Sequence, residues 1–171
     1  PLSFPSTMKI AFIKPPIGGI LGLEMLTFVE PLGPICVAAC LEADGHQCAV
    51  YDLRIDGEEA GLAECKKFDP DVVGLQCNFT TERNRTIRLA QRIKRDMPKA
   101  FVVVGGHDSS RDPDWFRHEA IDVIAIGDGK EVMPPLVNAL VEGTDLKKIP
   151  GLEVRDKEGW AFTGHAPTRP H

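Results

Sequence analysis

The chain has 171 residues, enough for one domain with a substantial core, and 43% of them are hydrophobic. A net charge of −5 argues against nucleic acid as a partner, because nucleic-acid-binding surfaces are basic. The chain has no run of about 18 apolar residues, so we expect no membrane span. Five cysteines scattered through apolar segments indicate reduced thiols and a cytoplasmic location rather than a disulfide framework.

Residues 1–7 lack the basic and apolar parts of a signal peptide, and we expect them to be a disordered leader or an expression remnant. Apolar runs then alternate with helix-like segments. We expect strands at residues 8–13, 47–53, 71–77, 100–104 and 121–126, and helices at residues 31–43, 57–68, 80–97, 113–119 and 130–142. This alternation predicts right-handed βαβ units in an α/β, flavodoxin-like sandwich of three layers, with a five-stranded parallel sheet in the order 2-1-3-4-5.

The pattern changes from residue 149 onward. Residues 152–155 and 160–163 favour a small β-hairpin, and residues 166–171, with two prolines, favour a linker. We therefore divide the chain into residues 1–7, a domain at residues 8–148, and a hairpin and linker at residues 149–171 that lead toward a further domain.

Two of the expected helices carry apolar or charged stripes. The apolar face of the helix at residues 31–43 is expected to consist of Leu32, Ile35, Cys36, Ala39 and Cys40. On the helix at residues 80–97, which Thr80 or Thr81 can cap, a solvated basic face is expected from Arg83, Arg88, Arg92 and Arg95.

The strand at residues 100–104 runs directly into Gly105, Gly106 and His107. Two residues without side chains let another group approach the backbone closely. In doubly wound sheets, ligands bind outside the carboxyl ends of the strands, at the switch between strands one and three. We therefore expect a ligand site at this edge, with His107 as a candidate contact.

Several other chemistries lack the residues that they need. A receiver domain holds magnesium with carboxylates at the ends of strands one and three, and neither Lys14-Pro15 nor Cys77-Asn78 supplies one. A flavin phosphate loop needs glycines and hydroxyls after strand one, where this chain has prolines.

Glycine and cysteine motifs are equally incomplete. The glycines of residues 18–22 have the wrong spacing for a dinucleotide fingerprint, and Gly127-Asp128-Gly129-Lys130 lacks the Ser or Thr of a phosphate loop. Cys36 and Cys40 share a helix face, but two small buried side chains explain the pair better than a metal site does.

Two families of corrinoid proteins resemble this chain. In the family with a histidine-ligated corrinoid, a strand is followed by Asp-x-His-x-x-Gly, and here Asp52 and Gly57 match while Arg54 stands in the histidine position. The amino-terminal cobalamin-binding domain of cobalamin-dependent radical SAM enzymes is more similar, along most of residues 8–169. The ordered matches are Ile13-Lys14-Pro15-Pro16, Glu30-Pro31-Leu32-Gly33, Asp44-Gly45-His46, Asp69-Pro70-Asp71-Val72-Val73-Gly74, Val104-Gly105-Gly106-His107, Ile121-Asp122-Val123, Ile126-Gly127-Asp128-Gly129 and Ile149-Pro150-Gly151-Leu152. Asp128 and Lys130 depart from the family's Gly-Glu-Gly-Glu turn.

This resemblance implies a corrin on the carboxyl edge of the sheet, with its nucleotide tail between strands one, three and four. The residues expected to contact the cofactor are Pro15, Pro16, Asp52, Arg54, Gly57, Gln76, Cys77, Asn78, Phe79, Thr80, Thr81, Gly105, Gly106, His107, Gly127, Asp128 and Gly129. A protonated arginine has no lone pair for a metal, so we predict that Arg54 lies near the lower face of a cobalt without a protein ligand, in cobalamin bound base-off. The long segment at residues 17–29 is expected to cover the upper face.

The implied function is that of a cobalamin-binding module from a larger radical SAM enzyme, of which many transfer a methyl group from methylcobalamin. A [4Fe-4S] cluster and S-adenosylmethionine would belong to a carboxyl-terminal radical SAM domain of the same polypeptide, so this chain alone is expected to bind without turnover. Two alternatives stay open: a free-standing corrinoid carrier, against which Arg54 counts, and a flavodoxin-like interaction or sensory domain without a corrin.

Overall fold

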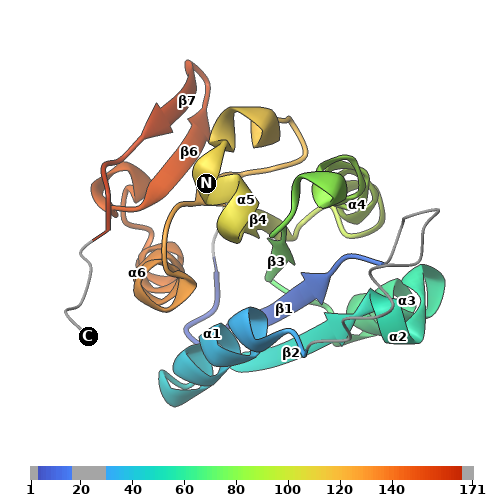
Figure 1. Cartoon of the computed structure of the whole chain (residues 1–171). Coiled ribbons are helices and arrows are strands. Elements are labelled where there is room, and N and C mark those ends of the chain that lie inside the picture. The colour runs from blue at the N-terminus through green and yellow to red at the C-terminus, as the bar shows by residue number, and fades with distance from the viewer. Residues whose placement is uncertain (1–3, 17–29, 167–171) are drawn as a thin grey trace.

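A seven-stranded sheet runs through the middle of the protein, in the order β2-β1-β3-β4-β5-β6-β7 (Figure 1). The computed structural model describes residues 4–16 and 30–166. The first five strands are parallel and the last two are antiparallel. The strands are β1 (Lys9–Lys14), β2 (Gln47–Asp52), β3 (Val72–Gln76), β4 (Phe101–Gly105), β5 (Val123–Ala125), β6 (Leu152–Asp156) and β7 (Gly159–Phe162).

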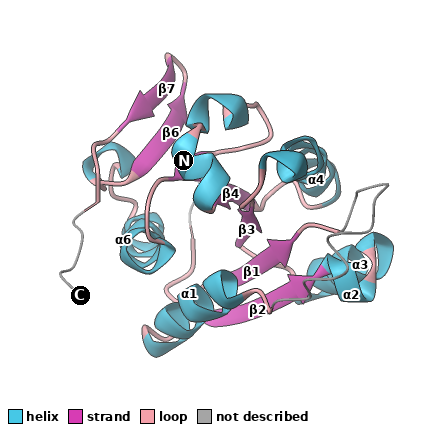
Figure 2. Ribbon diagram, in the orientation of Figure 1, coloured by secondary structure: helices cyan, strands magenta, loops and turns pink. Residues whose placement is uncertain are grey.

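Helices cover both faces of this sheet (Figure 2). The α-helices are α1 (Leu32–Ala43), α2 (Leu53–Asp56), α3 (Glu58–Phe68), α4 (Arg83–Asp96), α5 (His107–Arg111) and α6 (Gly129–Glu142), and the 3₁₀ helices are η2 (Thr80–Glu82), η3 (Pro113–Phe116) and η4 (Leu146–Lys148). One core lies under α1 and α6, and the other lies under α3 and α4. The predicted α/β sandwich and the parallel strand order 2-1-3-4-5 are confirmed.

The expected hairpin forms, and it extends the same sheet. Val154 of β6 lies opposite Val123 of β5. Glu153 is 3% exposed and accepts two hydrogen bonds from Arg117, at 2.8 and 3.0 Å. The hairpin is therefore fixed to the sheet by strand pairing and by an ion pair in which Glu153 is buried and Arg117 is exposed. At the other end of the chain, Phe4 packs edge-to-face on Phe101, with 6.2 Å between ring centroids.

The apolar face expected for α1 is wrong. The helix buries Pro34, Val37, Ala38 and Leu41, while Cys36 is exposed. Apolar residues occupy nearly every side of this helix, so two sets with helical spacing compete, and packing against the sheet selects the other set.

Arg83 was expected on a solvated face, and this expectation is also wrong. Its guanidinium is largely buried and donates to Asp108 at 2.5 Å and to Asp112 at 2.7 Å. The hydrogen bond from Arg83 holds the pKa of Asp108 below its ordinary value, against the effect of burial. This ion pair joins the start of α4 to α5.

The turn before α4 is stabilised by a carboxylate instead of a threonine. Glu82 accepts hydrogen bonds from the backbone N–H groups of Asn78 and Phe79, at 2.9 and 3.3 Å. The Thr80 hydroxyl instead donates to Asp108 at 3.0 Å. Among the helices within residues 4–16 and 30–166, none has the length and apolarity needed to cross a bilayer.

Candidate functional site

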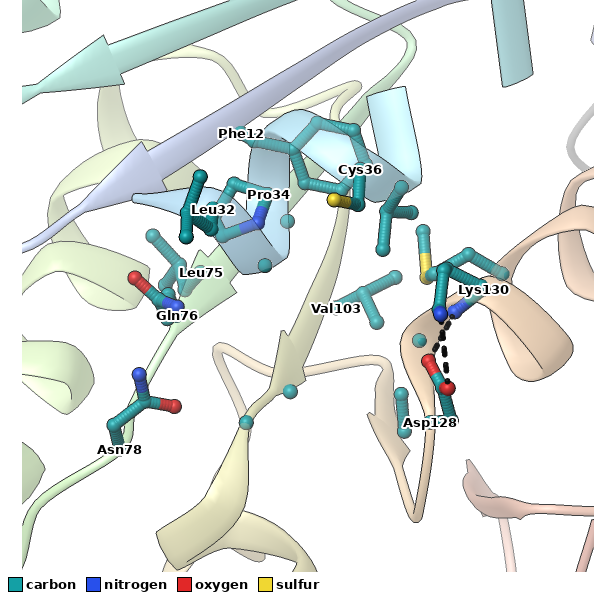
Figure 3. A pocket seen from close by; sticks show the side chains of 18 of the residues that line it. Phe12, Leu32, Pro34, Cys36, Leu75, Gln76, Asn78, Val103, Asp128 and Lys130 are labelled. Carbon is teal, nitrogen blue, oxygen red and sulfur yellow. Dashed lines mark hydrogen bonds and ion pairs between the residues drawn. The ribbon is translucent and has the colours of Figure 1, made fainter. Parts of the chain in front are cut away.

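A cavity of about 360 Å³ opens at the carboxyl edge of the sheet, between the N-terminal ends of α1 and α6 (Figure 3). Its volume falls within the range of about 300–1,000 Å³ that is usual for small-molecule sites. It lies at the switch point between β1 and β3, where the strand order reverses. Seven of the predicted site residues line it: Gln76, Asn78, Gly105, Gly106, Gly127, Asp128 and Gly129.

The strand register divides the sheet wall of this cavity into two layers. In the inner layer, Gly74 is paired with Phe12 of β1 and with Val103 of β4. A Cβ at Gly74 would lie 2.7 Å from the Phe12 ring, so that ring fills the space beside β3. Two residues further along, Gln76 is paired with Gly105 in the outer layer, at the strand ends.

Gln76 presents an unused hydrogen-bond acceptor. Its Oε1 atom is buried and has no hydrogen-bond partner among the residues that the structure describes. Buried polar atoms without partners are rare in native proteins, and each needs an explanation such as an absent ligand. Gln76 and Asn78 stand on one side of the cavity, across from Asp128 and Lys130 (Figure 3). Because this oxygen is itself buried, a donor group on a ligand would reach it only after the Gln76 amide rotates toward the cavity.

The two adjacent glycines have different roles. Gly106 has φ +123°, and a Cβ there would lie 2.4 Å from the Cys77 carbonyl oxygen. The fold itself therefore requires glycine at this position. A Cβ at Gly105 would meet only Ala125, at an ordinary contact distance of 3.6 Å. Nothing within the described chain requires Gly105 to lack a side chain, so its open backbone is available to a ligand.

The turn at the start of α6, residues 127–130, is stabilised by hydrogen bonding and packing of its own residues. The Asp128 carboxylate caps α6 by accepting a hydrogen bond from the Lys130 backbone N–H at 3.0 Å. A Cβ at Gly129 would lie 2.9 Å from Val37, so glycine here lets α1 and α6 approach each other. Packing between α1 and α6 therefore fixes the positions of the two cavity walls that these helices form.

The other predicted residues lie outside the cavity, at the ends of β1 and β2 and in the segments that follow β2, β3 and β4. They are Pro15, Pro16, Asp52, Arg54, Gly57, Cys77, Phe79, Thr80, Thr81 and His107. The His107 backbone N–H donates to Asn78 Oδ1 at 3.2 Å, and its side chain is exposed where α5 begins. The Cys77 thiol is buried, which raises its pKa to about 11. Residues 17–29, expected over the upper face of the corrin, lie outside the described residues.

Asp52 and Arg54 form a close pair at the end of β2. The Arg54 guanidinium donates to both carboxylate oxygens, at 2.8 and 2.5 Å. Burial would raise the pKa of Asp52, but the hydrogen bonds and positive charge of Arg54 outweigh it, so this pKa is lowered. The same hydrogen bond raises the pKa of Arg54, which keeps the guanidinium charged.

A second buried ion pair was not predicted from the sequence. Lys14, at the end of β1, donates to Glu82 at 2.5 Å, and the two side chains are only 8% and 10% exposed. The positive charge of Lys14 also contributes to the lowered pKa of Asp52. The Lys14–Glu82 and Arg54–Asp52 pairs both lie at the carboxyl edge of the sheet. In the sequence, Lys14 stands out as a charged residue between an apolar strand and two prolines.

The N-terminal turns of α1 are the main part of the cavity that sequence reasoning missed. Leu32, Gly33, Pro34, Cys36 and Val37 all line it. Leu32 is 57% exposed although it is apolar. The sequence signal for this wall was the motif Glu30-Pro31-Leu32-Gly33, which belongs to the family resemblance but was assigned no contact with the cofactor. Over residues 4–16 and 30–166, no group of three or more His, Cys, Asp or Glu side chains is arranged to hold a metal.

A doubly wound sheet with an apolar cavity and open backbone at its switch point defines a ligand-binding α/β domain. The chain belongs to the B12 binding domain family, whose model matches residues 18–137. This membership supports cobalamin as the ligand and confirms the corrinoid resemblance that the motifs predicted.

Three similar proteins illustrate the relationship. The hopanoid C-3 methylase of Methylococcus capsulatus is 28% identical over 155 residues, covering 89% of this chain and 30% of the methylase. An uncharacterized methyltransferase of Pyrococcus horikoshii is 31% identical over 153 residues, covering 87% of this chain and 33% of that protein. The radical S-adenosylmethionine methyltransferase TsrM from Kitasatospora setae, solved with cobalamin and a [4Fe-4S] cluster, shares the fold with a TM-score of 0.77 and 21% identity. That match covers 92% of this chain and 31% of TsrM. The chain thus spans about a third of the length of these curated relatives.

Proposed function

We propose that this chain is the cobalamin-binding part of a radical SAM enzyme and that the nucleotide tail of cobalamin enters the cavity beside Gly105. The observation that carries the proposal is the open backbone at Gly105 at the wall of the cavity, beside a Gln76 amide whose oxygen has no partner among the described residues and could turn toward a ligand. The residues therefore fit the tail, which offers ribose hydroxyl donors and a flat apolar base.

Bound cobalamin would supply a cobalt centre able to carry a methyl group. The residues of this chain would do the binding: Gly105 admits the tail, Gln76 accepts a hydrogen bond, and the strand ends support the corrin. One similar protein is named as a methylase and another as a methyltransferase, which favours methyl transfer for the whole protein. That activity would need a [4Fe-4S] cluster and S-adenosylmethionine on a further domain.

We further propose that the cofactor binds base-off without a nitrogen ligand on its lower face. A tail inserted between sheet and helices cannot also coordinate cobalt. Arg54 stands where the similar motif has histidine, and its hydrogen bonds to Asp52 keep it charged and without a lone pair.

Uptake of the cofactor is the first test. Purified protein is incubated with hydroxocobalamin, desalted and examined by absorption spectroscopy. We expect about one equivalent to be retained, with the spectrum of base-off cobalamin. A colourless protein after desalting would leave an interaction or sensory domain without a corrin as the function.

Electron paramagnetic resonance of the cobalt(II) state tests whether a nitrogen atom coordinates the lower face of the cobalt. We expect no nitrogen coupling in the native protein. In Arg54→His, Asp52 remains available to orient an imidazole, so nitrogen coupling should appear. The matched control is His107→Ala, which should leave the spectrum unchanged. Nitrogen coupling in the native protein would refute base-off binding without a protein ligand.

A further inference from the structure

The polar groups of the cavity are not evenly distributed along its depth. The inner sheet layer contributes Phe12 and Val103, and the helices contribute Val37 and Met133 one turn beyond their first residues at the cavity. All four side chains are at most 8% exposed to solvent. None of them carries a conventional hydrogen-bond donor or acceptor. The inner part of the cavity thus offers an apolar surface to whatever reaches it.

The unpartnered acceptor belongs to the outer layer. Gln76 lies two residues beyond Gly74 on β3, which places it about 6.6 Å closer to the strand ends. A nucleotide tail that enters base first would put its base against the inner layer and its ribose near Gln76. After rotation of its amide, Gln76 could accept a hydrogen bond from a ribose hydroxyl, while the base receives no polar partner from the inner side chains.

We propose that this cavity selects among cobamides by their base, accepting an apolar base such as dimethylbenzimidazole and disfavouring a purine. This inference rests on the proposed cobalamin binding. Adenine carries an exocyclic amine and additional ring nitrogens that are hydrogen-bonded in water. Against the inner side chains these groups lose that hydration without replacement. An apolar pocket rejects a ligand that adds a polar group by a factor on the order of 100.

The test compares three corrinoids by absorbance titration of the purified protein: hydroxocobalamin, the adenine-containing cobamide and cobinamide, which has no base. We expect hydroxocobalamin to bind tightest, with the adenine cobamide weaker by a factor of about 10 to 100. Equal affinity for the two cobamides, with cobinamide weaker, would overturn the selectivity and leave cobalamin binding intact. Equal affinity for all three would show that the base makes no contact and would overturn the inference as well. If hydroxocobalamin does not bind, the proposed function itself fails.

Substitutions that place a polar group in the inner layer of the cavity give a second test of the base preference. Met133→Gln keeps nearly the same volume and offers an amide to the base, so the preference for hydroxocobalamin over the adenine cobamide should fall several-fold. The matched control is Ile35→Gln, on an exposed position of α1 outside the cavity lining, which should leave the ratio unchanged. Val103→Thr provides a second inner-layer variant if Met133→Gln fails to fold by circular dichroism. An unchanged ratio in a folded inner-layer variant would contradict the proposal.

Discussion

Gly105 and Gly106 are neighbours, but the absence of a side chain has a different consequence at each position. The backbone of Gly106 adopts a positive φ, and any Cβ there collides with the Cys77 carbonyl. At Gly105 the chain leaves room for a methyl group. A glycine pair that looks uniform in the sequence therefore combines one residue demanded by the fold with one available to a ligand.

Alanine substitutions separate these two roles. Gly105→Ala should keep the free energy of unfolding within about 1 kcal/mol and weaken hydroxocobalamin binding at least about 10-fold, because the methyl group occupies the space of the tail. Gly106→Ala should lower the free energy of unfolding by about 1–3 kcal/mol through backbone strain and steric conflict. Urea denaturation and absorbance titration measure the two quantities. Native affinity in Gly105→Ala would argue against a tail in this cavity.

At the scale of the elements, α1 illustrates the limit of periodicity. The presence and bounds of the helix were predictable, because Pro31 and Gly45 flank an apolar segment. The choice of the buried face was not predictable, because Leu32, Ile35 and Cys36 match helical spacing as well as the residues that the sheet covers. The cavity depends on this difference, since Cys36 then lies at its wall.

Short helices, and ion pairs between residues far apart in the chain, could not be predicted from the sequence either. The four residues of α2 and the five of α5 are too few for a periodic pattern, so the segments after β2 and β4 looked like loops. Arg83 pairs with Asp108, which is 25 positions away, and spacing alone cannot indicate such a pair. By contrast, the strand order followed from alternation. Of the seven residues found at the cavity, Gln76, Asn78, Gly105 and Gly106 were expected from their positions at strand ends, and Gly127, Asp128 and Gly129 from the family resemblance.

Alkylation of Cys36 tests the position of α1 at the cavity. All five cysteines lie within the described residues, and only Cys36 is exposed. Burial raises the pKa of Cys65 to about 12 and that of Cys77 to about 11, so these thiols are poorly reactive. N-ethylmaleimide should modify Cys36 first, and bound hydroxocobalamin should slow this reaction several-fold, as mass spectrometry can measure.

The Cys36→Ala variant is the control for this assignment, because the fastest labelling should disappear from it. Equal labelling rates with and without hydroxocobalamin would place the cofactor away from α1.

At the scale of the whole molecule, the hairpin completes the sheet. Leu152 is fully buried and Val154 is 7% exposed, so β6 contributes to the core beneath α6. Burial of such side chains stabilises a fold by about 1.5–3 kcal/mol each. The ion pair between Arg117 and Glu153 further joins the hairpin to the rest of the chain.

Ending the chain at residue 148 should therefore lower the free energy of unfolding by about 3 kcal/mol or more. Guanidinium denaturation followed by circular dichroism measures the change. Phe162→Ser, at a position that is 48% exposed on β7, serves as the control and should have a small effect. A truncated protein with an unchanged midpoint would mean that residues 8–148 fold independently of the hairpin.

The cavity beside Gln76 also bears on how long the protein persists in a cell. A ligand present at about 100 times its Kd stabilises the folded state by about 2.7 kcal/mol, so cobalamin bound in this cavity would make the protein more resistant to transient opening than the apoprotein. Proteases that capture opened chains would then remove the vitamin-free form preferentially. Corrinoid supply would thus set the abundance of this protein as well as its occupancy.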